Sequence, residues 1–553
     1  PPAVPPSPCD RTRGLTAMFL AVFLALLLAA PAQAAISEQR ATAIADRDPK
    51  VVEHPGLEPS ARMVNGNWEV AYFAGGEQAA LVVVDPSTGE VRESWTGYQV
   101  AWKMARGYSG AFGHALNAPY VFLPLCALFL LGLVDWRRLR RVANLDLLVL
   151  LAFGVSHFFF NRGEIGVSVP LQYPALLYLL GRCLWIGFRG RGEGLRPVWP
   201  AAWLLVAALF LIGFRVGLNV ADSGAIDVGY ASVVGADRIA HGEPIYDNFP
   251  EDVSQGDTYG PVTYLSYVPF EAIWPWSGTW DDLPAAHGAA VFFDLATFAL
   301  LILLGTRIRP GPAGRRLAAT LAFGWAAYPY TAFALESNSN DTLVALLLVA
   351  TLLVLARPMV RGAMIALATF SKFAPALLAP MLMTYRSPET TDEGVLRARF
   401  TFSNPLIGRP TVLFATAFAT VSLAVMLWPA IDPGLITVYE RTIAYQAGRD
   451  SPFSLWGQVP SLEPLRLALL AGTAALSVLL AFRPKRKTLV QVAALGAALL
   501  IALQLTMQHW FYLYIVWFFP LLLVALSSSS APATAGKEPE PSPARRSQPA
   551  PAR

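Results

Sequence analysis

Long apolar runs separated by short polar segments dominate the pattern along the chain. Each run approaches 20 residues, about the length at which an α-helix crosses the hydrocarbon core of a bilayer. Eleven such runs are expected to form spanning helices, at about 116–134, 144–161, 168–187, 199–220, 286–305, 316–334, 341–356, 410–429, 465–482, 488–506 and 509–527. We therefore predict a polytopic α-helical membrane protein.

The short loops between these runs alternate in charge. Arginines cluster after the first, third, fifth and seventh runs, at Arg137, Arg138, Arg140 and Arg141, at Arg189, Arg191 and Arg196, at Arg307, Arg309, Arg315 and Arg316, and at Arg357 and Arg361. The positive-inside rule places such loops in the cytoplasm. The intervening loops, including 221–285, are then expected on the extracytoplasmic face.

One further apolar stretch, 362–385, contains Lys372 near its middle. As a single span it would move two later basic segments, 386–409 and 483–487, to the outside. Two half-length segments hinged at 372–375 avoid this, and broken helices are tolerated where they are buried in protein or line a cavity. We expect a re-entrant helix pair with Lys372 at its apex, and a single tilted span is the alternative.

The N-terminal region differs from the rest. Residues 1–35 combine a basic start, an apolar run and Ala32-Gln33-Ala34, a pattern typical of a signal peptide, with an uncleaved anchor as the alternative. Residues 36–115 are expected to form a small extracytoplasmic α+β domain, with a helix at 37–46, a strand at 68–73 and a hairpin over 81–95. Its Trp68-Glu69-Val70 and its Val83–Val91 hairpin resemble a PepSY-type domain, which implies an accessory or binding role.

Composition narrows the function classes. The chain of 553 residues is 55% hydrophobic and 14% charged, with net charge +4 and mean hydropathy +0.45, whereas soluble domains average about 25% charged residues. These values exclude a disordered chain, a coiled coil and a basic nucleic-acid binder, so no nucleic-acid partner is expected. The Ser/Pro/Ala-rich residues 528–553 are expected to be a disordered cytoplasmic tail.

The loop 221–285 is rich in acids and aromatics. The apolar spacing over 226–240 predicts an interfacial helix with Asp227 in its first turn. Asp227 could complement the helix dipole, or it could be a general base at the membrane surface. Aromatic side chains there suit both interface anchoring and stacking on sugar rings, and the candidate substrate-binding residues of this loop are Tyr230, His241, Tyr246 and Tyr259.

Polar residues elsewhere suggest phosphate chemistry. Lys372 is an ionisable residue in an apolar segment, a functional hypothesis by default, although it could also snorkel or pair with a buried acid. Arg441 and Arg449 suit phosphate binding or surface ion pairing. His509 could bind a head group or lie at the interface. The turn at 336–341, with Asn338 and Asn340, could be simple turn and cap chemistry.

Residues 199–527 resemble an integral-membrane glycosyltransferase of the GT-C type, closest to the bacterial polyprenyl-phosphate-mannose-dependent family 87. The matching segments are Asp227–Tyr230, Gly235–Tyr246, Tyr259–Tyr264, Asn338–Asp341, Gly362–Pro375 and Arg449 before Ser451–Trp456. The three spans within 116–198 lie outside the resemblance and are expected to be accessory. The resemblance implies that the catalytic base is Asp227, with Asp222 as a rival, because the paired acids of other GT-C groups are absent.

These observations predict an inverting transferase on the outer face of a bacterial-type plasma membrane. It would move a mannose- or arabinose-type sugar from a polyprenyl-phosphate donor to an extracytoplasmic glycolipid or glycan, with membrane lipid as its surroundings. Lys372, with Arg441 or Arg449, would stabilise the leaving phosphate. The chemistry requires no cofactor, and a divalent metal is not excluded. The alternatives are a transporter or flippase for lipid-linked sugars and a sensor that uses the PepSY-like domain.

Overall fold

The computed structural model describes residues 36–64, 66–74, 77–97, 115–190, 194–250, 253–386, 408–449 and 451–528. The chain divides into two compact units between Met104 and Ala105, and each is considered by itself. The expected signal peptide lies outside the described residues. So does the expected tail beyond residue 528, together with the basic residues Arg191, Arg397 and Arg399.

The N-terminal unit is a small α+β domain, as expected. Helices α2 (Glu38–Ala45) and α3 (Pro49–Val52) precede a four-stranded antiparallel sheet in the order β1-β2-β3-β4. Its strands are β1 (Glu58–Val64), β2 (Asn67–Ala74), β3 (Glu77–Val84) and β4 (Val91–Thr96). The expected helix, strand and hairpin are confirmed as α2, β2 and β3–β4, whereas α3 and β1 were not expected.

Apolar residues at alternate positions of the two central strands form the core of this domain. Val70 and Tyr72 of β2 and Val82 and Val84 of β3 are buried together with α2. The β3–β4 turn is closed by Asp85, whose carboxylate accepts hydrogen bonds from the Ser87 backbone N–H at 2.8 Å and the Ser87 hydroxyl at 2.6 Å. These local hydrogen bonds explain why Asp85 and Ser87 favour a turn at this position.

The described residues of the second unit form helices joined by loops and turns. Its longer helices are α5 (Pro119–Leu133), α6 (Val142–Asn161), α7 (Ile165–Arg189), α8 (Ala201–Asp222), α9 (Asp227–His241), α10 (Pro261–Glu271), α11 (Pro284–Ile308), α12 (Gly311–Ala327), α14 (Asp341–Leu353), α15 (Pro358–Lys372), α18 (Arg409–Pro429), α22 (Glu463–Phe482), α23 (Leu489–Gln504) and α24 (Ile515–Ser527). Its shorter elements are η1 (Ala115–Asn117), α13 (Pro329–Glu336), η3 (Ala374–Leu378), α16 (Ala379–Met383), η4 (Ala430–Gly434), α19 (Leu435–Tyr439), η5 (Glu440–Ala444), α20 (Tyr445–Gly448), α21 (Leu455–Gln458), η6 (Pro460–Leu462) and η7 (Tyr512–Tyr514).

Within the part of the chain that the structure describes, five helical segments are long and apolar enough to cross a membrane, by length and composition. They are Val142–Asn161, Ala201–Asp222, Pro284–Ile308, Arg409–Gly448 and Pro460–Phe482. The other expected spans coincide with helices that are shorter or more polar. The chain thus has the character of a multi-pass membrane protein.

The stretch 362–385 folds back on itself. α15 ends at Lys372, Phe373 has a left-handed backbone with φ of 50°, and η3 and α16 lead away from it. The Arg361 guanidinium at the start of α15 lies 5.2 Å from the ring centroid of Tyr385. A continuous helix of 24 residues would separate these ends by about 36 Å, so the chain forms a helical hairpin with Lys372 at its tip.

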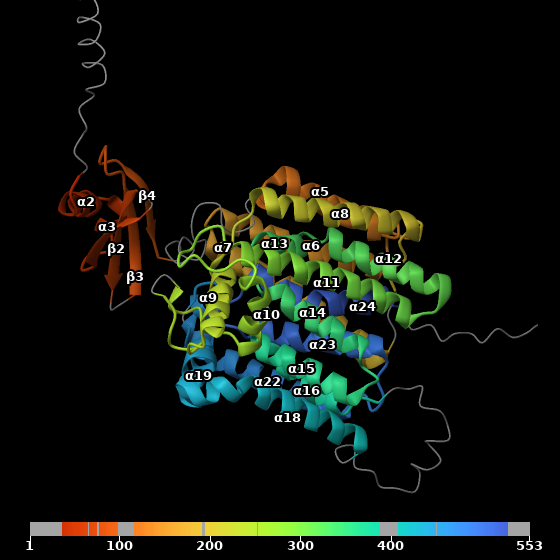
Figure 1. Cartoon of the computed structure of the whole chain (residues 1–553). Coiled ribbons are helices and arrows are strands. Elements are labelled where there is room, and N and C mark those ends of the chain that lie inside the picture. Colours follow the sequence, from red (N-terminus) through yellow and green to blue (C-terminus); the bar gives the residue numbers. More distant parts are fainter. Residues whose placement is uncertain are drawn as a thin grey trace, which may run out of the picture. The chain divides into compact units, whose positions relative to one another are not determined.

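The long helices of this unit run roughly side by side, and α9, α10 and α19 gather at one end of the bundle (Figure 1). The helix predicted over 226–240 is confirmed as α9, but its surroundings differ from those expected. Residues Val228–Ala236 are all buried, so α9 packs inside the unit and does not lie along its surface. Small residues permit this packing, because a Cβ at Gly229 would lie 2.4 Å from the Asn338 carbonyl oxygen.

Candidate active site

Asp227 is the first residue of α9, and the turn at 337–341 holds this helix in place. The Ile226 N–H donates to the Ser337 carbonyl at 3.2 Å. The Asn340 amide donates to the Ser232 hydroxyl at 2.9 Å. The position of Asp227 is therefore set by a segment more than 100 residues away.

A buried polar network supports the same turn from the other side. Asn338 has a left-handed backbone, with φ of 46°. Its amide donates to the Ser223 hydroxyl at 3.0 Å, and its oxygen accepts from the Asn219 amide at 2.8 Å. Left-handed backbone is tolerated best by glycine and asparagine, which explains the residue type. Asn338 and Asn340 thus position the turn, and neither is among the residues that line the cavities described below.

Lys372 pairs with a buried acid. Its ammonium donates to Asp341 Oδ1 at 2.6 Å, and the Trp517 indole N–H donates to the same oxygen at 2.8 Å. The ammonium also lies 4.8, 5.8 and 5.5 Å from the ring centroids of Tyr259, Tyr514 and Trp517, respectively. An adjacent carboxylate and aromatic faces both compensate an ammonium for lost hydration, so this environment can keep a buried lysine charged.

The segment containing Tyr259 docks directly on the tip of the hairpin. The Gly260 N–H and the Thr263 hydroxyl both donate to the Ser371 carbonyl, at 3.0 and 2.8 Å. A Cβ at position 260 would lie only 2.0 Å from the Phe370 carbonyl oxygen, so only glycine permits this approach. The Tyr246 hydroxyl donates to the Tyr259 carbonyl at 2.9 Å. The Tyr259–Pro261 segment thereby places the Tyr259 ring over Lys372.

A small cavity of about 80 Å³ collects the charged groups. Its wall includes five residues that the sequence predicted for the site, namely Asp227, Tyr259, Lys372, Arg449 and His509, together with Asp341 and Tyr514. The His509 ring hydrogen-bonds the Ser451 hydroxyl at 2.8 Å. Two carboxylates and two cationic side chains from four separate chain segments therefore face one space.

The Asp227 carboxylate can be reached by a small molecule, although burial removes part of its hydration. A water-sized molecule can reach the side chain, and the side chain faces the small cavity within the protein. Burial raises the pKa of the Asp227 carboxyl above its ordinary value, while attraction to Arg449, a hydrogen bond from the Val228 N–H and attraction to Lys372 act in the opposite direction. A carboxylate with a raised pKa is a stronger base, and this property is typical of catalytic sites.

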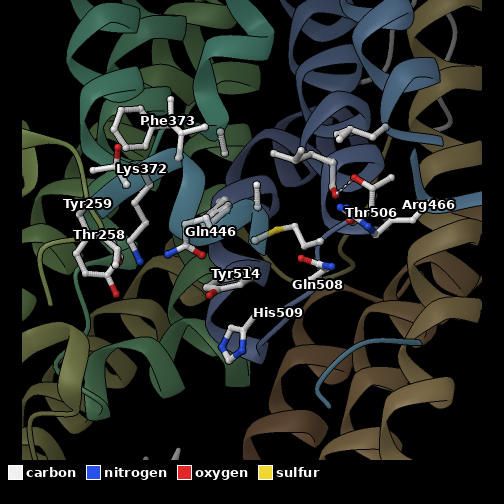
Figure 2. A pocket seen from close by; sticks show the side chains of 18 residues that line it. Thr258, Tyr259, Lys372, Phe373, Gln446, Arg466, Thr506, Gln508, His509 and Tyr514 are labelled. Carbon is white, nitrogen blue, oxygen red and sulfur yellow. Dashed lines mark hydrogen bonds between the residues drawn. The ribbon is translucent and has the colours of Figure 1, made fainter. Parts of the chain in front are cut away.

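A larger cavity of about 260 Å³ adjoins the small one, and both are lined by Tyr259, Lys372, His509 and Tyr514. Figure 2 shows Lys372 and Tyr259 on one side and Arg466 on the other, with Gln446 between them. Apolar side chains from three elements complete its wall, namely Ile443, Leu470 and Leu503. The larger cavity thus exposes mainly apolar surface, with polar side chains that include Lys372 on one side and Arg466 on the other.

Besides Asn338 and Asn340, five predicted site residues lie outside the walls of both cavities. Asp222 lies at the end of α8, and His241 lies at the exposed end of α9 beside Asp237, 3.2 Å away. Tyr230 is buried and stacks on Trp280, with 4.8 Å between ring centroids. Tyr246 supports Tyr259 as described above. The Arg441 guanidinium donates to both carboxylate oxygens of buried Asp257, at 2.6 and 2.8 Å, and so anchors the segment 435–448.

The sequence reasoning missed three residues of the site. Asp341, Tyr514 and Trp517 surround the Lys372 ammonium. Asp341 had been considered as part of a polar turn that resembles a family segment, and not as a site residue or as the partner of Lys372. The available signal was its position beside an apolar run, because a carboxylate at membrane depth requires a partner and Lys372 was the nearest unexplained cation.

Among the described residues, no group of three or more His, Cys, Asp or Glu side chains is arranged to hold a metal ion. Comparison with known protein families and with the curated proteins found no match. The chemistry must therefore be argued from the cavities themselves.

Proposed function

We propose that this chain is a membrane-embedded glycosyltransferase of the GT-C type. It would transfer a mannose- or arabinose-type sugar from a polyprenyl-phosphate donor to an extracytoplasmic glycolipid or glycan of a bacterial-type cell envelope. The observation that carries this proposal is the small cavity, in which Asp227, Lys372, Arg449 and His509 meet from distant segments. Asp227, Lys372 and Arg449 belong to the segments that resemble the family, and the resemblance implies the role of base for Asp227.

Asp227 would be the general base. Its carboxylate would take the proton of an acceptor hydroxyl, whose oxygen attacks the anomeric carbon of the donor sugar. The bond between this carbon and the phosphate oxygen breaks, and the phosphate leaves with the electron pair. A single displacement inverts the anomeric centre. The accessible surface and raised pKa of Asp227 support this role.

Lys372 and Arg449 would stabilise the leaving phosphate. Its negative charge grows as the bond breaks, so nearby fixed cations favour the transition state over the ground state. Both side chains line the small cavity with Asp227. Arg441 had been an equal candidate, but it lines neither cavity and its guanidinium is held by Asp257, which favours Arg449 for this role.

The larger cavity would receive the lipid end of the donor. It shares Lys372 with the small cavity, so a phosphate at the junction could place its sugar on one side and its lipid on the other. The adjoining segment 435–448 exposes apolar side chains on its outer side, with Ile436 76% and Tyr439 56% exposed. Such a surface suits contact with membrane lipid.

The membrane arrangement that we propose has eleven spans and one re-entrant pair. The positive-inside rule places the basic loops in the cytoplasm and the loop 221–285 outside. The five apolar segments and the helical hairpin at 362–385 support this arrangement. The cavities would then lie near the outer surface, where lipid-linked sugars and envelope acceptors meet. The PepSY-like domain would be an extracytoplasmic accessory domain.

The test is transfer of radiolabelled sugar in vesicles that contain the purified full-length protein. Vesicles are supplied with a polyprenyl-phosphate-linked sugar and an extract of envelope glycolipids as acceptors. The proposal predicts label in the acceptor fraction. Movement of the labelled lipid between leaflets without any labelled acceptor would instead indicate a flippase and would contradict the proposal.

A further inference from the structure

The Asp341 carboxylate is only half satisfied. Oδ1 accepts hydrogen bonds from Lys372 and Trp517, at 2.6 and 2.8 Å. Oδ2 has no hydrogen-bond partner among the described residues, although the side chain is fully buried. Asp341 also lines the small cavity that contains Asp227. The unpartnered oxygen therefore belongs to a carboxylate in the wall of this cavity.

A hydroxyl group is the ligand group that fits this oxygen. An unpaired buried acceptor is costly, and a neutral O–H donor satisfies it without adding charge. A second cation is a poorer fit, because Lys372 and Arg449 already supply positive charge to the cavity. Buried carboxylates flanked by aromatic rings, here Tyr259 and Tyr514, suit a polyhydroxylated ring, whose hydroxyls donate and whose C–H faces pack on aromatic surfaces.

We propose, on the basis of the function proposed above, that Asp341 is a specificity-determining residue that recognises the 2-hydroxyl of the transferred sugar. Asp341 holds the same ammonium that would contact the donor phosphate. The phosphate is attached to the anomeric carbon, so the sugar hydroxyl nearest to that ammonium is the one on the adjacent carbon. Oδ2 would accept this hydrogen bond, while Oδ1 keeps Lys372 in position.

This hydrogen bond would raise the rate of sugar transfer as well as determine which sugar is accepted. The sugar develops positive charge at the anomeric carbon during transfer, and hydrogen bonds to the 2-hydroxyl strengthen in transition states of this kind. A carboxylate beside that carbon also favours the positive charge. Asp227 would remain the base, because its carboxylate is accessible and is not paired with a cation among the described residues, whereas Asp341 is held by the Lys372 ammonium at 2.6 Å.

The experiment compares donors that each lack one hydroxyl. Purified full-length protein in nanodiscs is given the envelope glycolipid extract as acceptor, together with short-chain polyprenyl-phosphate mannose or arabinose or one of the corresponding monodeoxy analogues. Wild type should prefer the parent sugar over the 2-deoxy analogue by roughly 10²-fold in kcat/KM, as expected when a buried acceptor is left unpaired. Asp341→Asn should reduce that preference to less than about 5-fold. The asparagine oxygen would still accept from Lys372, but the NH₂ group in the place of Oδ2 is a donor and cannot accept a hydrogen bond from the 2-hydroxyl. Comparing the two proteins cancels the intrinsic reactivity of the deoxy sugar.

The matched control is Asp281→Asn, which removes an exposed carboxylate distant in sequence from both cavities and should keep the wild-type preference. Unchanged 2-deoxy discrimination in Asp341→Asn would overturn the proposal, as would a change confined to another hydroxyl. If wild type transfers neither sugar, the proposed function fails, and thermal stabilisation by the same lipids replaces turnover as the readout. Stabilisation that depends on the 2-hydroxyl in wild type but not in Asp341→Asn would still support the contact, and equal dependence would exclude it.

Discussion

The close approach of Gly260 to the hairpin tip allows a sharp prediction for Gly260→Ala. The new Cβ would lie 2.0 Å from the Phe370 carbonyl oxygen, whereas an ordinary contact begins at 3.4 Å. The two segments would have to separate by about 1.4 Å, the difference between these distances. The 3.0 Å hydrogen bond from Gly260 to Ser371 would stretch beyond its normal range. Tyr259 would move away from Lys372 with the rest of its segment.

The expected result is a folded but slow protein. Overpacking of this kind costs about 1–3 kcal/mol of stability, and a displacement of about 1 Å in a catalytic constellation can reduce the rate about 10²-fold. The measurements are the thermal unfolding midpoint and kcat/KM for sugar transfer. The control is Gly472→Ala in α22, where a Cβ meets nothing within 4 Å and activity should be unchanged. Wild-type activity and stability in Gly260→Ala would refute the view that this close docking builds the site.

Three further predictions test the charges and the topology. Arg449→Gln should move the acidic limb of the kcat/KM profile to higher pH, because Arg449 lowers the pKa of Asp227 and the base acts only when deprotonated; a shift to lower pH would contradict this. Asp257→Asn should lower the unfolding free energy by about 1–3 kcal/mol by breaking the pair with Arg441, whereas Glu440→Gln, at an exposed position, should not. Asp282→Cys should react with an impermeant maleimide added from outside and Arg138→Cys only after permeabilisation, and the reverse would invert the proposed topology.

Much of the helical pattern was accessible from the sequence because apolar length and helix formation are local properties. Each expected apolar run overlaps a helix, although the run at 316–334 is divided between α12 and α13. The reversal at Phe373 followed from the distribution of arginines across loops, and the contact between Arg361 and Tyr385 confirms the hairpin. The strand β1 was missed because its exposed sequence has little alternation.

The site was only partly predictable, for a physical reason. The sequence identified Asp227, Lys372 and Arg449 as charged residues in unusual positions, and all three line the small cavity. It could not show which carboxylate pairs with Lys372, because that depends on how the tip of one hairpin packs on a distant turn. The same applies to Arg441, whose partner Asp257 lies in another loop. Long-range pairing between charges is decided by tertiary packing.

The role of Asp227 as the base is tested most directly by comparing Asp227→Asn with Asp222→Asn. Both positions are exposed to a water-sized molecule and lie close together in sequence, but only Asp227 lines the small cavity. In the vesicle transfer assay, Asp227→Asn should reduce kcat about 10²–10⁴-fold, as expected for loss of a general base, and Asp222→Asn should retain most activity. Undiminished transfer by Asp227→Asn, or a loss confined to Asp222→Asn, would contradict the central claim.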